Sequence, residues 1–226
     1  MKRPTIYITL LTLLLLLLIA IDLYAGGIKL SFVNMSDVER QIFYDLRMPR
    51  VITAVLAGIS LSVSGLMMQT LFRNPLAGPY ILGVSSGAML GVGLLLMVGT
   101  LVGFRVSGGT LVSVAILGAY ILLFIVLLIS KKLRNNVSVL IIGMMFGSIA
   151  GALVNIMQSF ANPDSLKLFI VWSMGSLTSV SWSDIPMFGI IIVVGLILSF
   201  CLIKPLNGLQ LGEENGKALG INIELT

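Results

Sequence analysis

The sequence predicts an all-α polytopic membrane protein, and three observations support this fold class. Of its 226 residues, 58% are hydrophobic and only 10% are charged. The mean hydropathy is +1.10. A soluble domain carries about 25% charged residues, because water must solvate its surface. The uncharged residues also fall into long runs, each able to supply the roughly 20 apolar residues that a helix needs to cross a bilayer. We therefore expect the chain to span a membrane several times.

Six uncharged runs predict six spanning helices in one transmembrane domain. Their cores are expected at residues 6–25, 51–70, 80–102, 111–129, 139–160 and 185–203. The first run follows Lys2 and Arg3, so a signal peptide is the alternative for it. Its apolar stretch exceeds the 7–15 residues typical of a signal peptide, and residues 21–25 form a poor cleavage site. An uncleaved first helix is therefore expected.

The distribution of basic residues predicts the direction of insertion. With six helices and a cytoplasmic N-terminus, eight of the fourteen Lys and Arg residues fall on the cytoplasmic side. Basic residues are enriched in cytoplasmic loops. This bias favours a multi-pass protein with its N-terminus inside.

Three spans carry small residues at helical spacing. They are Gly58, Ser62 and Gly65 in the second span, Gly83, Gly87 and Gly91 in the third, and Gly143, Gly147 and Gly151 in the fifth. Lipid provides little hydrophobic force between helices, so close backbone approach at small residues supplies much of the packing energy. We interpret these faces first as packing surfaces.

A polar face in the fifth span is less easily explained by packing. Gly151, Asn155 and Gln158 are separated by four and three residues and so share one side of a helix. A buried amide in hydrocarbon costs several kcal/mol unless it is hydrogen-bonded or hydrated. From these residues alone, a water-filled path and an interhelical hydrogen bond are equally good explanations.

Absent residue types exclude several function classes. The chain has no histidine and one cysteine, Cys201, so zinc sites of His/Cys clusters, His-based catalysis and an intramolecular disulfide are excluded. No phosphate-binding Gly-rich loop is present, so we expect no nucleotide hydrolysis by this chain and no cofactor. Basic residues form no long run, so no nucleic-acid partner is expected. Apart from Asp22, no charged side chain lies within a spanning core, which disfavours an ion-coupled carrier.

Two segments outside the spans predict short helices. Residues 168–183 are uncharged but too short to span comfortably, and Trp172 and Trp182 favour the headgroup level. A short interfacial or re-entrant helix on the outer side is expected there. After the sixth span, the acidic pair at 213–214, Lys217 and Gly220 suit the two ends of a helix outside the membrane.

A set of motifs in a fixed order carries a family resemblance. They are residues 46–50 (LRMPR), 64–69 (SGLMMQ), 72–77 (FRNPLA), 82–88 (LGVSSGA), 172–177 (WSMGSL) and 211–214 (LGEE). Together they resemble the permease subunits of bacterial ABC importers for iron-siderophores, haem and cobalamin. The resemblance extends from about residue 40 to residue 222.

The resemblance implies how the protein works and with which partners. Permeases of this family have ten spanning helices, so residues 1–226 would be a single transmembrane domain that corresponds to the N-terminal part and ends just after the cytoplasmic coupling helix. The family pairs two permease copies, alike or different, in the bacterial inner membrane. A cytoplasmic ABC ATPase supplies energy, and a periplasmic or lipid-anchored binding protein delivers the substrate.

The resemblance also assigns roles to individual residues. It implies binding-protein docking at Arg47 and Arg50. An inner gate and passage would be formed by Asn74, Leu76, Asn136, Ser138, Asn155 and Gln158. Coupling to the ATPase would use Leu211, Gly212, Glu213, Glu214, Ala218, Leu219 and Gly220. For the arginines, the residues alone favour anchoring at the headgroups or pairing with Asp45 and Glu39.

The predicted function is therefore transport without catalysis by this chain. A permease would move an iron-siderophore, haem or cobalamin-type chelate inward, driven by the separate ATPase. The alternatives are an ion-coupled secondary transporter and a membrane-embedded enzyme. The enzyme lacks the buried Ser/His, paired Asp or metal ligands that such chemistry uses.

Overall fold

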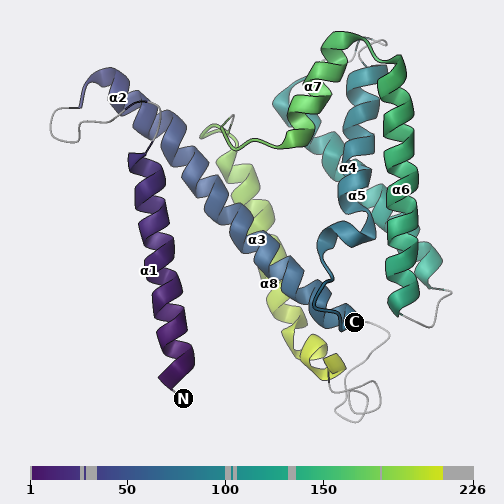
Figure 1. Ribbon diagram of the computed structural model, residues 1–226, viewed down its shortest axis with the longest axis horizontal. Helices are drawn as coiled ribbons and strands as arrows, with labels where there is room; N and C mark the ends of the chain where they lie inside the picture. The colour runs from purple at the N-terminus through teal and green to yellow at the C-terminus, as the bar shows by residue number, and fades with distance from the viewer. Residues whose placement is uncertain are drawn as a thin grey trace. The chain divides into compact units, whose positions relative to one another are not determined.

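The computed structural model describes residues 2–25, 28, 35–99, 103, 106–131, 136–178 and 180–210, and the regular structure within them is helical (Figure 1). The elements run α1 (Lys2–Tyr24), α2 (Asp37–Gln41), η1 (Ile42–Arg47), α3 (Met48–Phe72), η2 (Pro79–Leu82), α4 (Val84–Gly93), η3 (Leu94–Val98), α5 (Gly108–Ser130), α6 (Asn136–Phe160), α7 (Pro163–Met174) and α8 (Ile185–Gln210). The predicted all-α class is confirmed. Lipid permits this result because an α-helix satisfies its backbone groups internally.

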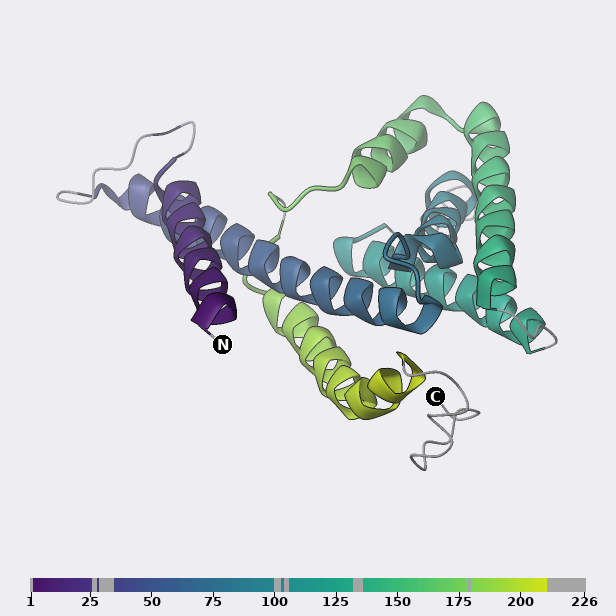
Figure 2. The same cartoon turned by 60° about the horizontal axis from the view of Figure 1, so that its bottom comes forward.

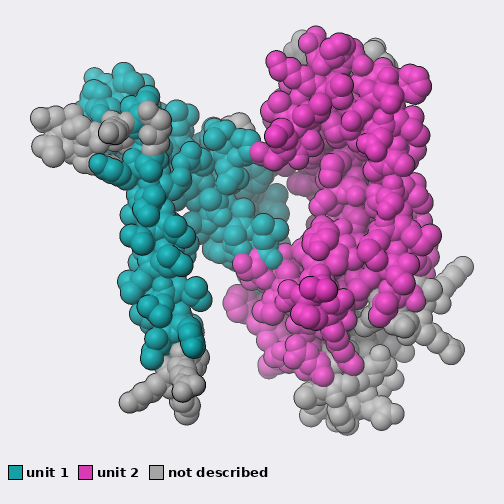
Figure 3. Space-filling view, in the orientation of Figure 1, with its two compact units in different colours: residues 1–61, 176–198 teal, residues 62–175, 199–226 magenta. Residues whose placement is uncertain are grey.

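The chain forms two compact units (Figure 3). Unit 1 comprises Met1–Leu61 and Ser176–Leu198, and unit 2 comprises Ser62–Gly175 and Ser199–Thr226. Within the described residues, five helices are long and apolar enough to cross a membrane: Thr5–Tyr24, Asp37–Phe72, Gly108–Ser130, Val137–Phe160 and Ile185–Gly208. These agree with five of the six predicted spans. The expectation of one domain over residues 1–226 stays a prediction.

The third predicted span begins later than expected. The sequence pattern places its start at residue 80, but Pro79–Leu82 forms a 3₁₀ turn and Gly83 has φ of 76°. This left-handed conformation suits glycine, which has no Cβ to clash, and it separates the turn from α4. The apolar helix then runs over Val84–Val98, about 22 Å at 1.5 Å per residue. Within the described residues, this helix is therefore shorter than a full span.

Unit 2 is built on close glycine contacts around α4. A Cβ on Gly87 would lie 2.5 Å from the Gly118 carbonyl oxygen of α5, and one on Gly91 would lie 2.7 Å from the Val114 oxygen. On the α6 side, a Cβ on Gly143 would lie 2.8 Å from Leu82 Cα. The third span and the first part of the fifth therefore pack through their glycines, as predicted.

Three other predicted small-residue positions show no close approach at an added Cβ. A Cβ on Gly58, Gly65 or Gly151 would have no described atom within 4 Å. The packing interpretation therefore does not extend to these glycines within the described part of the chain.

Two apolar clusters complete the core of unit 2. One joins Leu82, Leu122, Val126, Leu140 and Ala150. The other joins Val92, Leu96, Met97, Val154 and Phe169. Phe169 comes from α7, so this short helix is fixed by a buried aromatic side chain. The second cluster thus holds α7 against η3 and α6.

Helix α7 corresponds to the short helix expected at 168–183, but it begins and ends earlier. Asn162 caps its N-terminus by accepting a hydrogen bond from the Ser165 backbone N–H at 2.8 Å, and Pro163 takes the first helical position. Both residue types are typical of helix starts. The helix ends at Gly175, whose φ is 73°. The capping residues therefore set the two ends of α7. The bounds of the uncharged stretch, from which the sequence prediction was made, did not.

The loop before α8 is held within unit 1. The Trp182 indole Nε1–H donates a hydrogen bond to the Tyr44 carbonyl at 2.8 Å. Nearby, the Ser181 hydroxyl and backbone N–H donate to the Asp184 carboxylate at 2.7 and 3.0 Å, and these bonds lower the pKa of Asp184. The loop is thereby attached to η1.

Candidate functional site

The loop after α3 turns sharply at Asn74, as its following proline predicts. The Asn74 backbone N–H donates to the Gln69 carbonyl at 3.1 Å. Its side-chain Oδ1 accepts a hydrogen bond from the Leu76 backbone N–H at 2.9 Å. Arg73 reaches φ of 47° at the end of the helix, a conformation that glycine usually takes. These bonds leave the Leu76 side chain 79% exposed.

The second part of the predicted gate lies at the start of α6. η2 packs against α6, where Leu82 and Leu140 share an apolar cluster, so the Asn74 loop leads directly to the first half of this helix. Ser138 is half-buried there. Asn136 begins α6, and its side chain lies outside the described residues. The structure thus brings the loop and α6 into one region of unit 2.

The predicted passage residues lie near the other end of α6. Asn155 is exposed and Gln158 is half-buried, whereas the adjacent Val154 is 4% exposed against α7 and η3. The amide face therefore points away from the second apolar cluster. Together with Gly151, it forms a small polar strip on a helix that is long and apolar enough to span a membrane.

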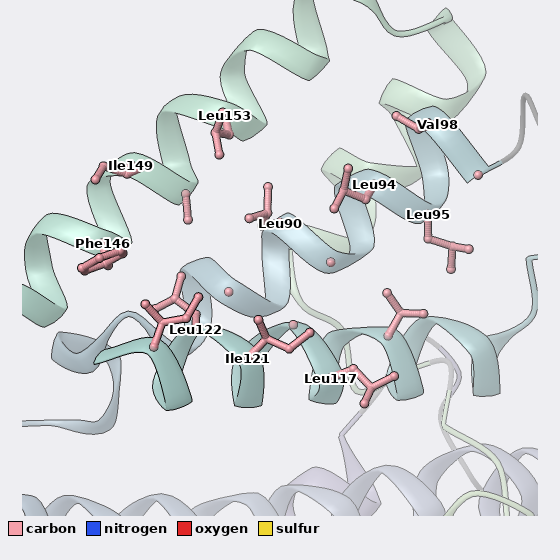
Figure 4. Close-up of a pocket in the computed structure, with 17 residues that line it drawn as sticks. Leu90, Leu94, Leu95, Val98, Leu117, Ile121, Leu122, Phe146, Ile149 and Leu153 are labelled. Atoms are coloured by element: carbon pink, nitrogen blue, oxygen red, sulfur yellow. The ribbon is translucent and has the colours of Figure 1, made fainter. Parts of the chain in front are cut away.

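A cavity of about 680 Å³ lies between α4, η3, α5 and α6. Figure 4 shows Phe146, Ile149 and Leu153 of α6 facing it from one side and Leu117 and Ile121 of α5 from the other. Its lining contains no charged residue, and Asn155 and Gln158 are not part of it. A charged or strongly hydrated substrate would lose its hydrogen bonds to water there without replacement. We therefore do not place the passage in this cavity.

Arg47 is buried in unit 1 and is bonded to backbone. Its side chain is only 6% exposed. Nη1 donates hydrogen bonds to the carbonyls of Leu23 and Tyr24 at 2.6 and 2.9 Å, and Nη2 donates to Ile28 at 2.6 Å. The predicted docking role of Arg47 is untested, but its donors already have partners within the chain.

Arg50 forms an ion pair that sequence reasoning missed. Its guanidinium donates to the Asp22 carboxylate at the end of α1, and the two side chains are 31% and 45% exposed. The partner is neither Asp45 nor Glu39. The signal available in the sequence was Asp22 itself, because an isolated carboxylate at the end of a span calls for a basic partner.

The predicted coupling residues, from Leu211 to Gly220, lie outside the described residues.

Comparison with known proteins identifies the family. The model of the FecCD transport family matches residues 8–226. The chain belongs to the FecCD transport family. This confirms the permease family indicated by the motifs, and it agrees with the several apolar helices of a multi-pass membrane protein.

Relatives of this FecCD-family chain are named as permeases for different substrates. It is 33% identical over 227 residues to the hemin transport system permease protein HmuU of Yersinia pestis, covering 98% of this chain and 68% of the relative. It is 35% identical to the vitamin B12 import system permease protein BtuC of Klebsiella pneumoniae, covering 95% and 64%. A molybdate import system permease protein, MolB of Haemophilus influenzae, is 31% identical over 198 residues, covering 86% and 57%.

A solved structure has the same fold as this FecCD-family chain. It is described as an inward-facing conformation of a transporter assigned to the metal-chelate ABC type. The TM-score is 0.84 at 32% identity, and the match covers 98% of this chain and 69% of that one. The chain thus spans roughly two thirds of the length of these proteins or somewhat less.

Proposed function

We propose that this chain belongs to a permease that moves an iron-siderophore, haem or cobalamin-type chelate into the cytoplasm. The observation that carries the proposal is the FecCD family match over residues 8–226. Relatives named as permeases for hemin and vitamin B12 support a large chelate as the substrate of this chain. A relative named for molybdate adds an oxyanion to the substrates found among the relatives. The five long apolar helices among the described residues support a membrane-spanning protein.

The partners and the orientation follow from the same proposal. A separate cytoplasmic ABC ATPase would bind the segment that contains Glu213 and Glu214, and a second permease copy would complete the passage. The N-terminus would lie in the cytoplasm of a bacterial inner membrane. The binding protein would dock at the outer end of α3, where Arg50 is the arginine that remains partly accessible.

Uptake into vesicles tests the proposal. The permease is reconstituted with the ATPase and binding protein of its own system, and labelled ferric siderophore, haem and cobalamin are supplied separately. We expect uptake of one class that requires ATP and continues when ionophores collapse the ion gradients. Uptake that is indifferent to ATP and abolished by ionophores would instead identify an ion-coupled carrier.

Thiol labelling tests the gate and passage. In a Cys201→Ser background, we expect cysteines at Asn74, Leu76, Asn155 and Gln158 to react with a water-soluble maleimide at rates that change at least several-fold when nucleotide binds the ATPase. Cysteine at Phe124, exposed on α5 among apolar residues, is the control and should stay unreactive because lipid covers it. If all five cysteines were equally unreactive toward the maleimide, Asn155 and Gln158 would be explained by packing between helices, and the proposed passage would be refuted.

A further inference from the structure

Helix α1 presents an apolar surface on every side. Each described side chain from Thr5 to Leu18 is exposed, and the stretch consists mainly of leucine and isoleucine. Its polar residues are Thr5, Tyr7, Thr9 and Thr12, and the hydroxyls of Thr9 and Thr12 donate to the carbonyls of Thr5 and Ile8 at 2.9 and 2.8 Å within the same helix. The six residues from Leu13 to Leu18 are all leucine.

The sequence of α1 also has few of the residues that bring helices together in membranes. Such contacts are enriched in Gly, Ala, Ser and Thr, which allow backbones to approach closely. Residues 6–19 contain no Gly, Ala or Ser, and the hydroxyls of their two threonines, Thr9 and Thr12, are bonded within the same helix. Unit 2 shows the opposite arrangement, since α4 and α5 meet at Gly87 and Gly118, and α6 meets η2 at Gly143. By this contrast, acyl chains of lipid are the surroundings that α1 suits.

The outer end of α1 is different, because it is held by charge. Leu23 and Tyr24 are its last residues, and the last carbonyls of a helix generally accept hydrogen bonds from outside it. Arg47 donates to both. Its positive charge also suits the negative end of the helix dipole. Asp22, the residue directly before Leu23, pairs with Arg50. Figures 1 and 2 show α1 meeting the start of α3 at this end and diverging from it.

We propose that α1 is a lipid-facing helix whose orientation is set by a clamp at its outer end, formed by Arg47 and Arg50 with the α1 carbonyls and Asp22. The clamp joins α1 to the beginning of α3 inside unit 1. The rest of α1, from Thr5 to Leu18, is solvated by lipid tails. Arg47 is a positioning residue in this arrangement, independent of any role in transport.

Spin-label accessibility tests the lipid-facing surface. In the Cys201→Ser chain in lipid nanodiscs, single cysteines at Leu10, Leu11, Leu13 and Leu14 are spin-labelled, and collisions with oxygen and with a water-soluble nickel chelate are measured. We expect high oxygen and low nickel accessibility at all four positions. An oxygen minimum at one or two of them, repeating at helical spacing, would show a partner helix such as a second copy and would overturn the lipid assignment.

Distance distributions test the clamp. Spin labels at Leu10 and Ala54, both exposed, report the angle between α1 and α3. We expect one narrow distribution in the parent chain and at least a twofold broader one in Arg47→Leu and in Arg50→Ala. Asp22→Arg combined with Arg50→Asp should narrow it again, because the reversed pair restores the attraction.

The matched control is Arg40→Ala, which removes a basic residue of the same segment that forms no part of the clamp. An unchanged width in Arg47→Leu, or a reversed pair as broad as Arg50→Ala, would overturn the clamp. Insertion is verified for every variant by size-exclusion profile, so failure to fold is recognised separately. Transport is not used as a readout, and the result therefore stands apart from the proposed function.

Discussion

Replacing Gly118 by alanine is expected to disrupt the contact between α4 and α5. The added Cβ would lie well inside 3.0 Å of the Gly87 carbonyl oxygen, closer than real Cβ atoms approach other atoms. The obstructing atom is backbone, so no side-chain rotation relieves the clash and the two helices must separate. Overpacking of this kind costs about 1–3 kcal/mol, and we expect the upper part of that range. Thermal unfolding in detergent, followed by near-UV circular dichroism, measures the loss.

Gly109 provides the matched control on the same helix. A Cβ there would meet no atom within 4 Å. Gly109→Ala should leave the unfolding temperature unchanged or raise it, because alanine is the better helix former. If both variants unfold at the same temperature, the close crossing at Gly118 is refuted.

Replacing Phe169 by alanine is also expected to destabilise the protein strongly. This side chain is 2% exposed and packs among Val92, Leu96, Met97 and Val154. Truncation of a buried phenylalanine leaves a cavity and costs about 3–5 kcal/mol. Because Phe169 holds α7 to η3 and α6, we expect α7 to detach before the remaining helices unfold. Hydrogen exchange of the α7 amides should therefore accelerate at least tenfold.

Val171 serves as the control for the same helix. It lies on the exposed face of α7, at 59% exposure, so Val171→Ala removes no packed contact. Its exchange rates should stay within twofold of the parent. Equal acceleration in the two variants would mean that α7 is held by its ends and that the Phe169 cluster contributes little.

Long uncharged runs predicted the helices well because lipid leaves a chain few other options. The runs at 111–129 and 139–160 fall inside α5 and α6. The start of the third span was missed because residues 79–82 are as apolar as a helix interior. Only the left-handed φ of Gly83 separates them from α4. Glycine adopts positive and negative φ about equally readily, so the sequence alone does not predict which one it takes.

The candidate site was less accessible to sequence reasoning. Local chemistry predicted the turn at Asn74, since proline restricts the residue before it. The pairing of Arg50 with Asp22 joins residues 28 positions apart in the sequence. Two other carboxylates, Asp45 and Glu39, lie closer to Arg50 in the sequence. The choice among them depends on where α1 ends beside α3, which is a tertiary property. The docking, gate and coupling roles stay predictions.

The hydrogen bond from Trp182 to Tyr44 has a consequence for the order of synthesis. It joins residues 138 positions apart. Most of the intervening chain, Ser62–Gly175, belongs to unit 2. At about 5–20 residues per second, a ribosome takes roughly 6–23 s to make Ser62–Gly175. During this time the Tyr44 carbonyl has no indole donor, because Trp182 has not yet been synthesised. The helices of unit 2 between them emerge first and have time to associate. The first segment of unit 1 is therefore made well before the second segment, Ser176–Leu198, with which it pairs.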